Sequence, residues 1–134
     1  MQDVIEKIIS SYKKIAVVGM SPKPIRPSHG VSQYLITHGF DVVGVNPGTT
    51  EILGKPVYPT LSDIPGDLEI VDVFRSSEFV PEIVDQAIAK GAKALWLQEG
   101  VSHPEAEEKA RQAGLLVVSN RCILKEHRRL SAKS

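Results

Sequence analysis

The stretch Ile15-Ala-Val-Val-Gly-Met-Ser-Pro-Lys-Pro-Ile-Arg-Pro-Ser28 decides the fold class of this chain. It begins with a short apolar run, breaks at Gly19 and continues into a loop rich in proline and cations. An apolar strand that ends at a glycine and leads into a helix presents backbone N–H groups and a helix N-terminus to a phosphate. The stretch therefore predicts an α/β domain that binds a nucleotide-type ligand.

Further apolar runs of strand length follow at 42–45, 70–74, 94–97 and 115–118, and amphipathic helical patterns cover 31–38, 80–90 and 104–113. Apolar strands that alternate with helices are typical of a parallel sheet covered on both faces. We therefore predict one doubly wound, Rossmann-like α/β domain over residues 1–134, a length that suits a single hydrophobic core. We also expect an N-terminal helix at about 2–12, a C-terminal helix at about 122–130 and a flexible tail at 131–134.

Local signals refine this outline. Prolines and polar residues between 47 and 67 predict only a short strand near 55–58 and one helical turn near 61–64. Serine is a favoured N-cap, and serines precede the three central helical patterns. We expect Ser28, Ser76 or Ser77, and Ser102 to cap these helices.

Composition narrows the class of protein. Lys plus Arg and Asp plus Glu each number 16, so the formal net charge is zero, which disfavours a nucleic-acid partner. The N-terminus has acidic residues and lacks the apolar core of a signal peptide, and no apolar run approaches the roughly 20 residues of a membrane span. We expect a cytoplasmic protein. The single cysteine, Cys122, and four scattered histidines offer no metal-ligand spacing, so we predict no metal site.

Ligands of open parallel sheets bind beyond the carboxyl ends of the strands. The first such loop lacks the G-x-G-x-x-G fingerprint, because prolines stand where its later glycines would be, and cations and hydroxyls are left to bind phosphate. The predicted site residues lie in this loop or directly at the other strand ends: Gly19, Met20, Ser21, Arg26, Ser28, Val45, Asn46, Pro47, Phe74, Arg75, Leu97, Gln98 and Glu99.

The end of the second strand bears on the choice of nucleotide. An NAD site has an acidic side chain there that binds the ribose hydroxyls, whereas this strand ends in Asn46. A neutral amide tolerates a phosphorylated ribose better than a carboxylate does. This residue disfavours NAD and leaves NADP and coenzyme A open, although Asn-Pro is also an ordinary turn sequence.

A set of short motifs appears in a specific order between Lys14 and Leu130: VVGMSP at 17–22, VNP at 45–47, ILG at 52–54, YP at 58–59, VFR at 73–75, LWLQEG at 95–100 and NRCI at 120–123. Through these motifs the chain resembles stand-alone CoA-binding domain proteins. It is similar to the N-terminal CoA-binding domain of the succinyl-CoA synthetase α subunit. The resemblance implies a coenzyme A site made from the residues named above, with the first loop around the phosphates.

The resemblance also has limits. The synthetase has a glycine-richer first loop, and a lysine where this chain has Thr49. Its phosphorylated histidine belongs to a second domain, so what the resemblance implies is binding of CoA or an acyl-CoA rather than ligase activity. No nucleophile has an adjacent base by local spacing, and we expect a non-catalytic or accessory role.

Two alternatives remain open at this point. One is a small NADP-dependent reductase or acyl-CoA enzyme that uses Cys122 as its reactive group. The other is a nucleotide-responsive sensor or interaction module. The partner protein, if any, and a possible homodimer are not specified by the sequence.

Overall fold

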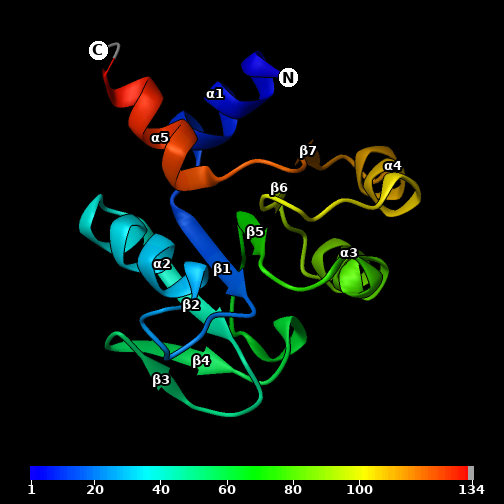
Figure 1. Cartoon of the computed structure of the whole chain (residues 1–134). Helices are drawn as coiled ribbons and strands as arrows, with labels where there is room; N and C mark the ends of the chain where they lie inside the picture. Colours follow the sequence, from blue (N-terminus) through cyan, green and yellow to red (C-terminus); the bar gives the residue numbers. More distant parts are fainter. Residues whose placement is uncertain (133–134) are drawn as a thin grey trace.

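A seven-stranded sheet forms the centre of the computed structural model, which describes residues 1–132 (Figure 1). The strands lie in the order β3-β4-β2-β1-β5-β6-β7, and all neighbours are parallel except β3 and β4. The strands are β1 (Lys14–Val18), β2 (Asp41–Val45), β3 (Glu51–Ile52), β4 (Lys55–Tyr58), β5 (Ile70–Val73), β6 (Ala94–Leu97) and β7 (Leu116–Val118).

Residues 1–132 form five α-helices and two short 3-10 helices. They are α1 (Gln2–Ser11), α2 (Pro27–Thr37), α3 (Val80–Ala89), α4 (Pro104–Gln112) and α5 (Ile123–Ala132), with η1 (Leu61–Asp63) and η2 (Ser77–Phe79). Helix α1 precedes β1, α5 follows β7, and the others lie in the connections between strands. The predicted α/β class, the strand near 55–58 and the turn near 61–64 are confirmed. The two-residue strand β3 was not predicted, because its register is set by pairing with β4 and not by its own sequence.

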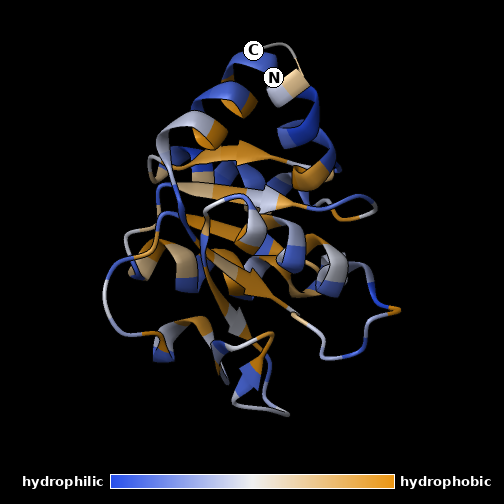
Figure 2. Ribbon diagram, turned by 90° about the vertical axis from the view of Figure 1, so that its left-hand side faces the viewer, coloured by the Kyte–Doolittle hydropathy of each residue, from blue (hydrophilic) through white to orange (hydrophobic). Residues whose placement is uncertain are grey.

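The helices cover both faces of the sheet and bury two separate apolar clusters. Helices α3 and α4 pack with η1 over one face, and α1, α2 and α5 pack over the other. Figure 2 shows the apolar strands between helices whose outer surfaces are hydrophilic. Side chains alternate between the two clusters along each strand, as pleating requires, so Ala16 and Val18 face one layer and Ile15 and Val17 the other.

Helix α1 completes the second layer. Its residues Ile5, Ile8 and Ile9 are buried, and the helix lies beside α5 and β7. The N- and C-terminal helices therefore lie at the same end of the molecule (Figure 1). The apolar face of α1, which could have packed on this domain or on a second copy, is buried within the chain.

Several predicted helix ends differ from the structure. Helix α2 begins earlier than expected, with Arg26 at its N-cap, so Ser28 lies in the first turn instead of capping it. Helix α4 is capped by His103, whose Nδ1 accepts from the Ala106 amide at 3.2 Å, and not by Ser102. Helix α3 begins after η2, with Phe79 at its N-cap, although Ser76 does precede η2.

The chain's C-terminal end also differs from the prediction. Helix α5 runs to Ala132, so residues 131 and 132 belong to it, whereas a flexible tail was expected there. The remainder of that predicted tail, residues 133–134, lies outside the described residues. No helix within residues 1–132 combines the length and apolar character that crossing a membrane demands.

The order in which the chain adds strands to the sheet reverses at β1. From β1 the chain steps to β2 and β4 on one side, and then returns to β5 and continues to β6 and β7 on the other. Ligands of doubly wound sheets bind outside the carboxyl ends of the strands at such a switch point. The fold therefore directs attention to the loops that follow β1, β2, β5 and β6.

Candidate nucleotide-binding site

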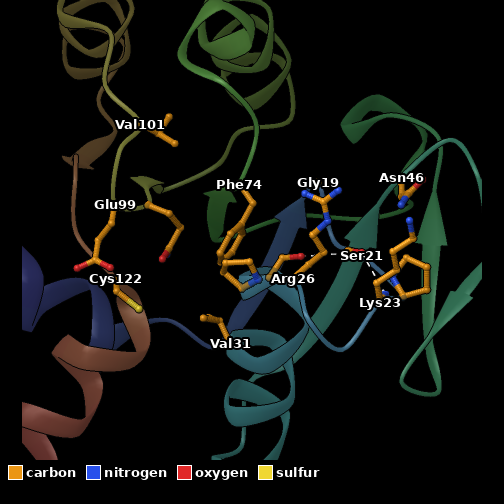
Figure 3. A pocket seen from close by; sticks show the side chains of 14 residues that line it. Gly19, Ser21, Lys23, Arg26, Val31, Asn46, Phe74, Glu99, Val101 and Cys122 are labelled. Atoms are coloured by element: carbon orange, nitrogen blue, oxygen red, sulfur yellow. Dashed lines mark hydrogen bonds between the residues drawn. The ribbon is translucent and has the colours of Figure 1, made fainter.

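A cavity of about 550 Å³ lies at this carboxyl edge. That volume falls within the range of small-molecule sites. Figure 3 shows Ser21, Lys23 and Arg26 on one side of it and Glu99 and Cys122 on the other. Its lining comes from loops far apart in sequence and consists of Gly19, Ser21, Pro22, Lys23, Arg26, Pro27, Ser28, Val31, Asn46, Phe74, Gln98, Glu99, Val101 and Cys122.

The loop after β1 is held in place by its own polar groups. Gly19 adopts φ +89°, a left-handed conformation that turns the chain directly after the strand. The Ser21 amide then donates to Ser28 Oγ at 3.0 Å, and the Lys23 amide donates to Ser21 Oγ at 3.1 Å. Ser28, predicted as a phosphate ligand, therefore uses its hydroxyl to fix this loop against α2.

This side of the cavity is suited to an anion. The first turn of α2 lines it, and no side chain caps the helix's N-terminus. Lys23 and Arg26 are exposed, and neither has an ion-pair partner within the described residues. A helix N-terminus with two free cations attracts phosphate groups through charge and backbone N–H donors.

Asn46 links the ends of β1 and β2. Its Nδ2 donates to the Met20 carbonyl at 2.8 Å, and its Oδ1 accepts from the Gly48 amide at 2.7 Å. Both ends of the amide are thus engaged within the chain. Asn46 lines the cavity as predicted, but its side chain positions the loops in addition to any contact with a ribose.

A buried polar pair lies at the end of β6. Gln98, 4% exposed, donates from Nε2 to Oδ1 of Asp72 at 2.6 Å, and Asp72 is fully buried within β5. Burial raises the pKa of the Asp72 carboxyl to about 8, although the hydrogen bond from Gln98 acts in the opposite direction. Sequence reasoning named Gln98 but missed Asp72, which interrupts the apolar run at 70–74.

The rest of the cavity lining combines apolar side chains with the polar Gln98 and Glu99 at the end of β6. Phe74, Val31 and Val101 contribute carbon surface there, and the thiol of Cys122 lies at its margin (Figure 3). Glu99 pairs with Lys125 of α5 at 3.0 Å, and this contact raises the pKa of the lysine. A second cavity of about 440 Å³ adjoins the first and shares Glu99 and Cys122 with it.

The structure does not bring every predicted site residue into the cavity. The side chains of Met20, Val45 and Leu97 are buried in the core. Met20 packs so closely on β2 that a Cβ at position 44 would lie 2.6 Å from its Sδ, which explains Gly44. Pro47 is exposed and lies outside the lining.

Arg75 is directed to the opposite face of the sheet. Its guanidinium lies 4.1 Å from the centre of the Phe79 ring, beside a cavity of about 100 Å³ between η1 and α3. Because side chains alternate along an extended segment, Phe74 and Arg75 face opposite sides, and only Phe74 lines the larger cavity.

Other lining residues carried little signal in the sequence. Val31 and Val101 are ordinary apolar side chains, and Pro22 and Pro27 were interpreted as substitutes for glycine in the loop. Cys122, the reactive group of one alternative function, is half-buried and lines the cavity.

No histidine within residues 1–132 is among the residues that line the cavity. Tyr34 of α2 stacks on His38 with ring centres 3.9 Å apart, and its hydroxyl lies 2.8 Å from Nδ1 of His127 on α5. Burial lowers the pKa of His127, with smaller contributions from His38 and Lys13. These rings join α2 to α5, and residues 1–132 contain no group of three or more potential metal ligands.

The structure is a Rossmann-like α/β domain with a cavity at the carboxyl edge of its sheet. Residues 13–128 match the CoA binding domain family, and the chain belongs to that family. This agrees with the resemblance noted from the motifs.

Relatives fall into two groups. An uncharacterized protein of Bacillus subtilis (strain 168), YneT, is 36% identical over 123 residues, which cover 92% of this chain and 91% of that protein. The ADP-forming acetate–CoA ligase I of Archaeoglobus fulgidus is 26% identical over 121 residues, which cover 83% of this chain but only 18% of the ligase. Among solved structures, a hypothetical protein from Pyrococcus horikoshii OT3 superposes with a TM-score of 0.93 at 47% identity, covering 98% of this chain and 92% of that one.

Proposed function

We propose that this chain binds coenzyme A or an acyl-CoA in the cavity at the carboxyl edge of the sheet, beside the N-terminus of α2, as an accessory protein without catalytic activity of its own. The observation that carries the proposal is a single cavity that has cations and the N-terminus of α2 at one end, and Phe74, Gln98, Val101 and Cys122 at the other. Coenzyme A likewise has its phosphates at one end and its pantetheine arm at the other. Membership in the CoA binding domain family supports this ligand.

The fold suggests how such a ligand lies. In doubly wound sheets the diphosphate lies at the N-terminus of the helix that follows the first strand, and the nucleoside lies towards the end of the second strand. Here those positions are Arg26 with the first turn of α2, and the neighbourhood of Asn46. The pantetheine arm then extends the other way, past Phe74 and Gln98 towards Cys122.

Calorimetric titration of the protein with CoA, dephospho-CoA and NADPH tests the proposal. We expect saturable binding of CoA, weaker binding of dephospho-CoA because the cationic loop loses a phosphate partner, and weak binding of NADPH because it has no pantetheine arm. Equal affinities for the three ligands, or no binding of CoA, would contradict the proposal.

A second candidate, an acyl-CoA enzyme, is favoured by one observation: the thiol of Cys122 lies at the cavity. Alkylation of Cys122 with and without CoA, and release of free CoA from acyl-CoA by the protein and by Cys122→Ser, separate the two. Protection by CoA without release supports the accessory role. Release that Cys122→Ser abolishes supports the enzyme.

A further inference from the structure

The Asp72–Gln98 pair is an unusual feature of this sheet. Asp72 lies level with Val17 of β1 and Trp96 of β6, in the middle of the sheet face covered by α1, α2 and α5. Its Oδ1 accepts the hydrogen bond from Gln98, but its Oδ2 has no partner. Within residues 1–132, Ser32 Oγ on α2 is the one other buried side-chain oxygen or nitrogen without a partner.

The hydrogen bond decides which end of the Gln98 amide faces the cavity. Its Nε2 is directed at Asp72, a residue that does not line the cavity, whereas Gln98 itself does. Its Oε1 has no hydrogen-bond partner in the described chain, yet it is not among the fully buried atoms. The cavity wall at β6 therefore presents a hydrogen-bond acceptor held in one orientation.

We propose that Gln98 Oε1 is a specificity determinant that accepts a hydrogen bond from an amide N–H of the pantetheine arm, and that Asp72 is the positioning residue that holds it there. The inference rests on the proposed function, because the arm passes Gln98 only if CoA lies as described above. An acceptor at this point favours a ligand with a donor and disfavours one that presents only acceptors or carbon.

The surroundings of Asp72 suit this role. Val17 and Trp96 flank it in the sheet, and the helices over this face contribute apolar side chains and Ser32 to the same layer. Burial raises the pKa of its carboxyl and the bond from Gln98 opposes that shift, while no charged group contributes. Because its pKa is raised to about 8, the carboxyl is mainly protonated at neutral pH, and its Oδ1 accepts from Gln98. An asparagine at this position retains an oxygen that can accept the same hydrogen bond and, like the protonated acid, carries no charge.

The experiment compares CoA with adenosine 3′,5′-diphosphate, a nucleotide without the arm, in calorimetric titrations of the unchanged protein and three variants. Gln98→Met keeps the length of the side chain and removes the acceptor, and we expect it to weaken CoA binding about 5- to 20-fold while nucleotide binding stays within about twofold. Asp72→Leu frees the amide and should give the same pattern. Asp72→Asn retains the acceptor for Nε2 and should bind CoA within about twofold of the unchanged protein.

Several outcomes would overturn the inference. Gln98→Met that binds CoA normally, or that weakens both ligands equally, removes Gln98 as a determinant of the arm. Asp72→Asn that loses as much CoA affinity as Asp72→Leu shows a general structural role. If Asp72→Leu does not fold, Gln98→Met and Asp72→Asn decide the matter. Failure of the unchanged protein to bind CoA overturns the proposed function itself, which is a different result from failure of the variants alone.

Discussion

The two faces of the sheet differ in what they bury. The face under α3 and α4 is packed with aliphatic side chains, and its buried charged residue, Glu107, is engaged by the His103 amide at 2.7 Å and by Arg111. The face under α1, α2 and α5 also buries Ser28, Ser32, Asp72 and Gln98. Two oxygens on this second face have no partner.

The unpaired polar groups suggest that the two faces serve different purposes. An unpaired buried polar group costs about 1–3 kcal/mol, so a face built only for stability has no reason to hold two of them. The cavity opens on the face where they occur, beside α2 and α5. We interpret the α3/α4 face as a stabilising layer and the α2/α5 face as the layer that sacrifices stability for the site.

Leu95→Ala gives the largest expected effect and acts on the α3/α4 face alone. Leu95 is completely buried in that cluster, so removal of its side chain should lower the free energy of unfolding by about 2–5 kcal/mol. CoA affinity should remain unchanged at a temperature where the variant is folded. Urea unfolding and calorimetry measure the two quantities, and a parallel loss of affinity would show that the faces are not independent.

Asp72→Asn acts on the other face and should produce a pH-dependent difference in stability. The pKa of Asp72 is raised to about 8 in the folded protein, against about 4 in the unfolded chain, so between these values the folded state holds the extra proton. Stability of the unchanged protein should therefore fall as pH rises from 4 to 8, by at most about 1.4 kcal/mol per pH unit.

The asparagine variant lacks this titration. It should gain up to a few kcal/mol over the unchanged protein by pH 8, with no further gain above that pH. Urea unfolding of both proteins from pH 4.5 to 9 checks the prediction. Unfolding free energies that run parallel across this range would mean that Asp72 ionises normally in the folded state.

Arg26→Ala and Arg75→Ala form a matched pair with the smallest expected effect. Arg26 lines the cavity, whereas Arg75 stacks on Phe79 on the α3/α4 face. Loss of a charge-assisted contact should weaken CoA binding by about 1–3 kcal/mol in Arg26→Ala and leave it unchanged in Arg75→Ala. Titration of both variants with CoA measures this. If Arg75→Ala weakened CoA binding more than Arg26→Ala, the phosphates would lie on the α3/α4 face and the proposed site would be contradicted.

Much of the site follows from chain order. The apolar runs, the glycine after the first strand and the polar strand ends predicted the α/β class and placed Ser21, Arg26, Asn46, Phe74 and Gln98 at one edge. Each of these residues lines the cavity. Errors arose where a strand end was taken as a unit, because neighbouring side chains face opposite layers. For this reason the Arg75 side chain lies on the opposite face of the sheet, and the side chains of Met20, Val45 and Leu97 are buried in the core.

The amino-acid sequence by itself determined the strand that begins at Ile15, the turn at Gly19 and the presence of a helix after them, because these are local properties of the chain; it did not give the residue at which α2 begins. Only the tertiary structure decided which side chains share a cavity. Ser21 and Cys122, about a hundred residues apart in sequence, line opposite sides of the same cavity because α5 packs on α2, where the Tyr34 hydroxyl lies 2.8 Å from Nδ1 of His127. The orientation of the Gln98 amide likewise depends on Asp72 in the neighbouring strand, 26 positions earlier, because β5 and β6 pair in a register that places the two residues together.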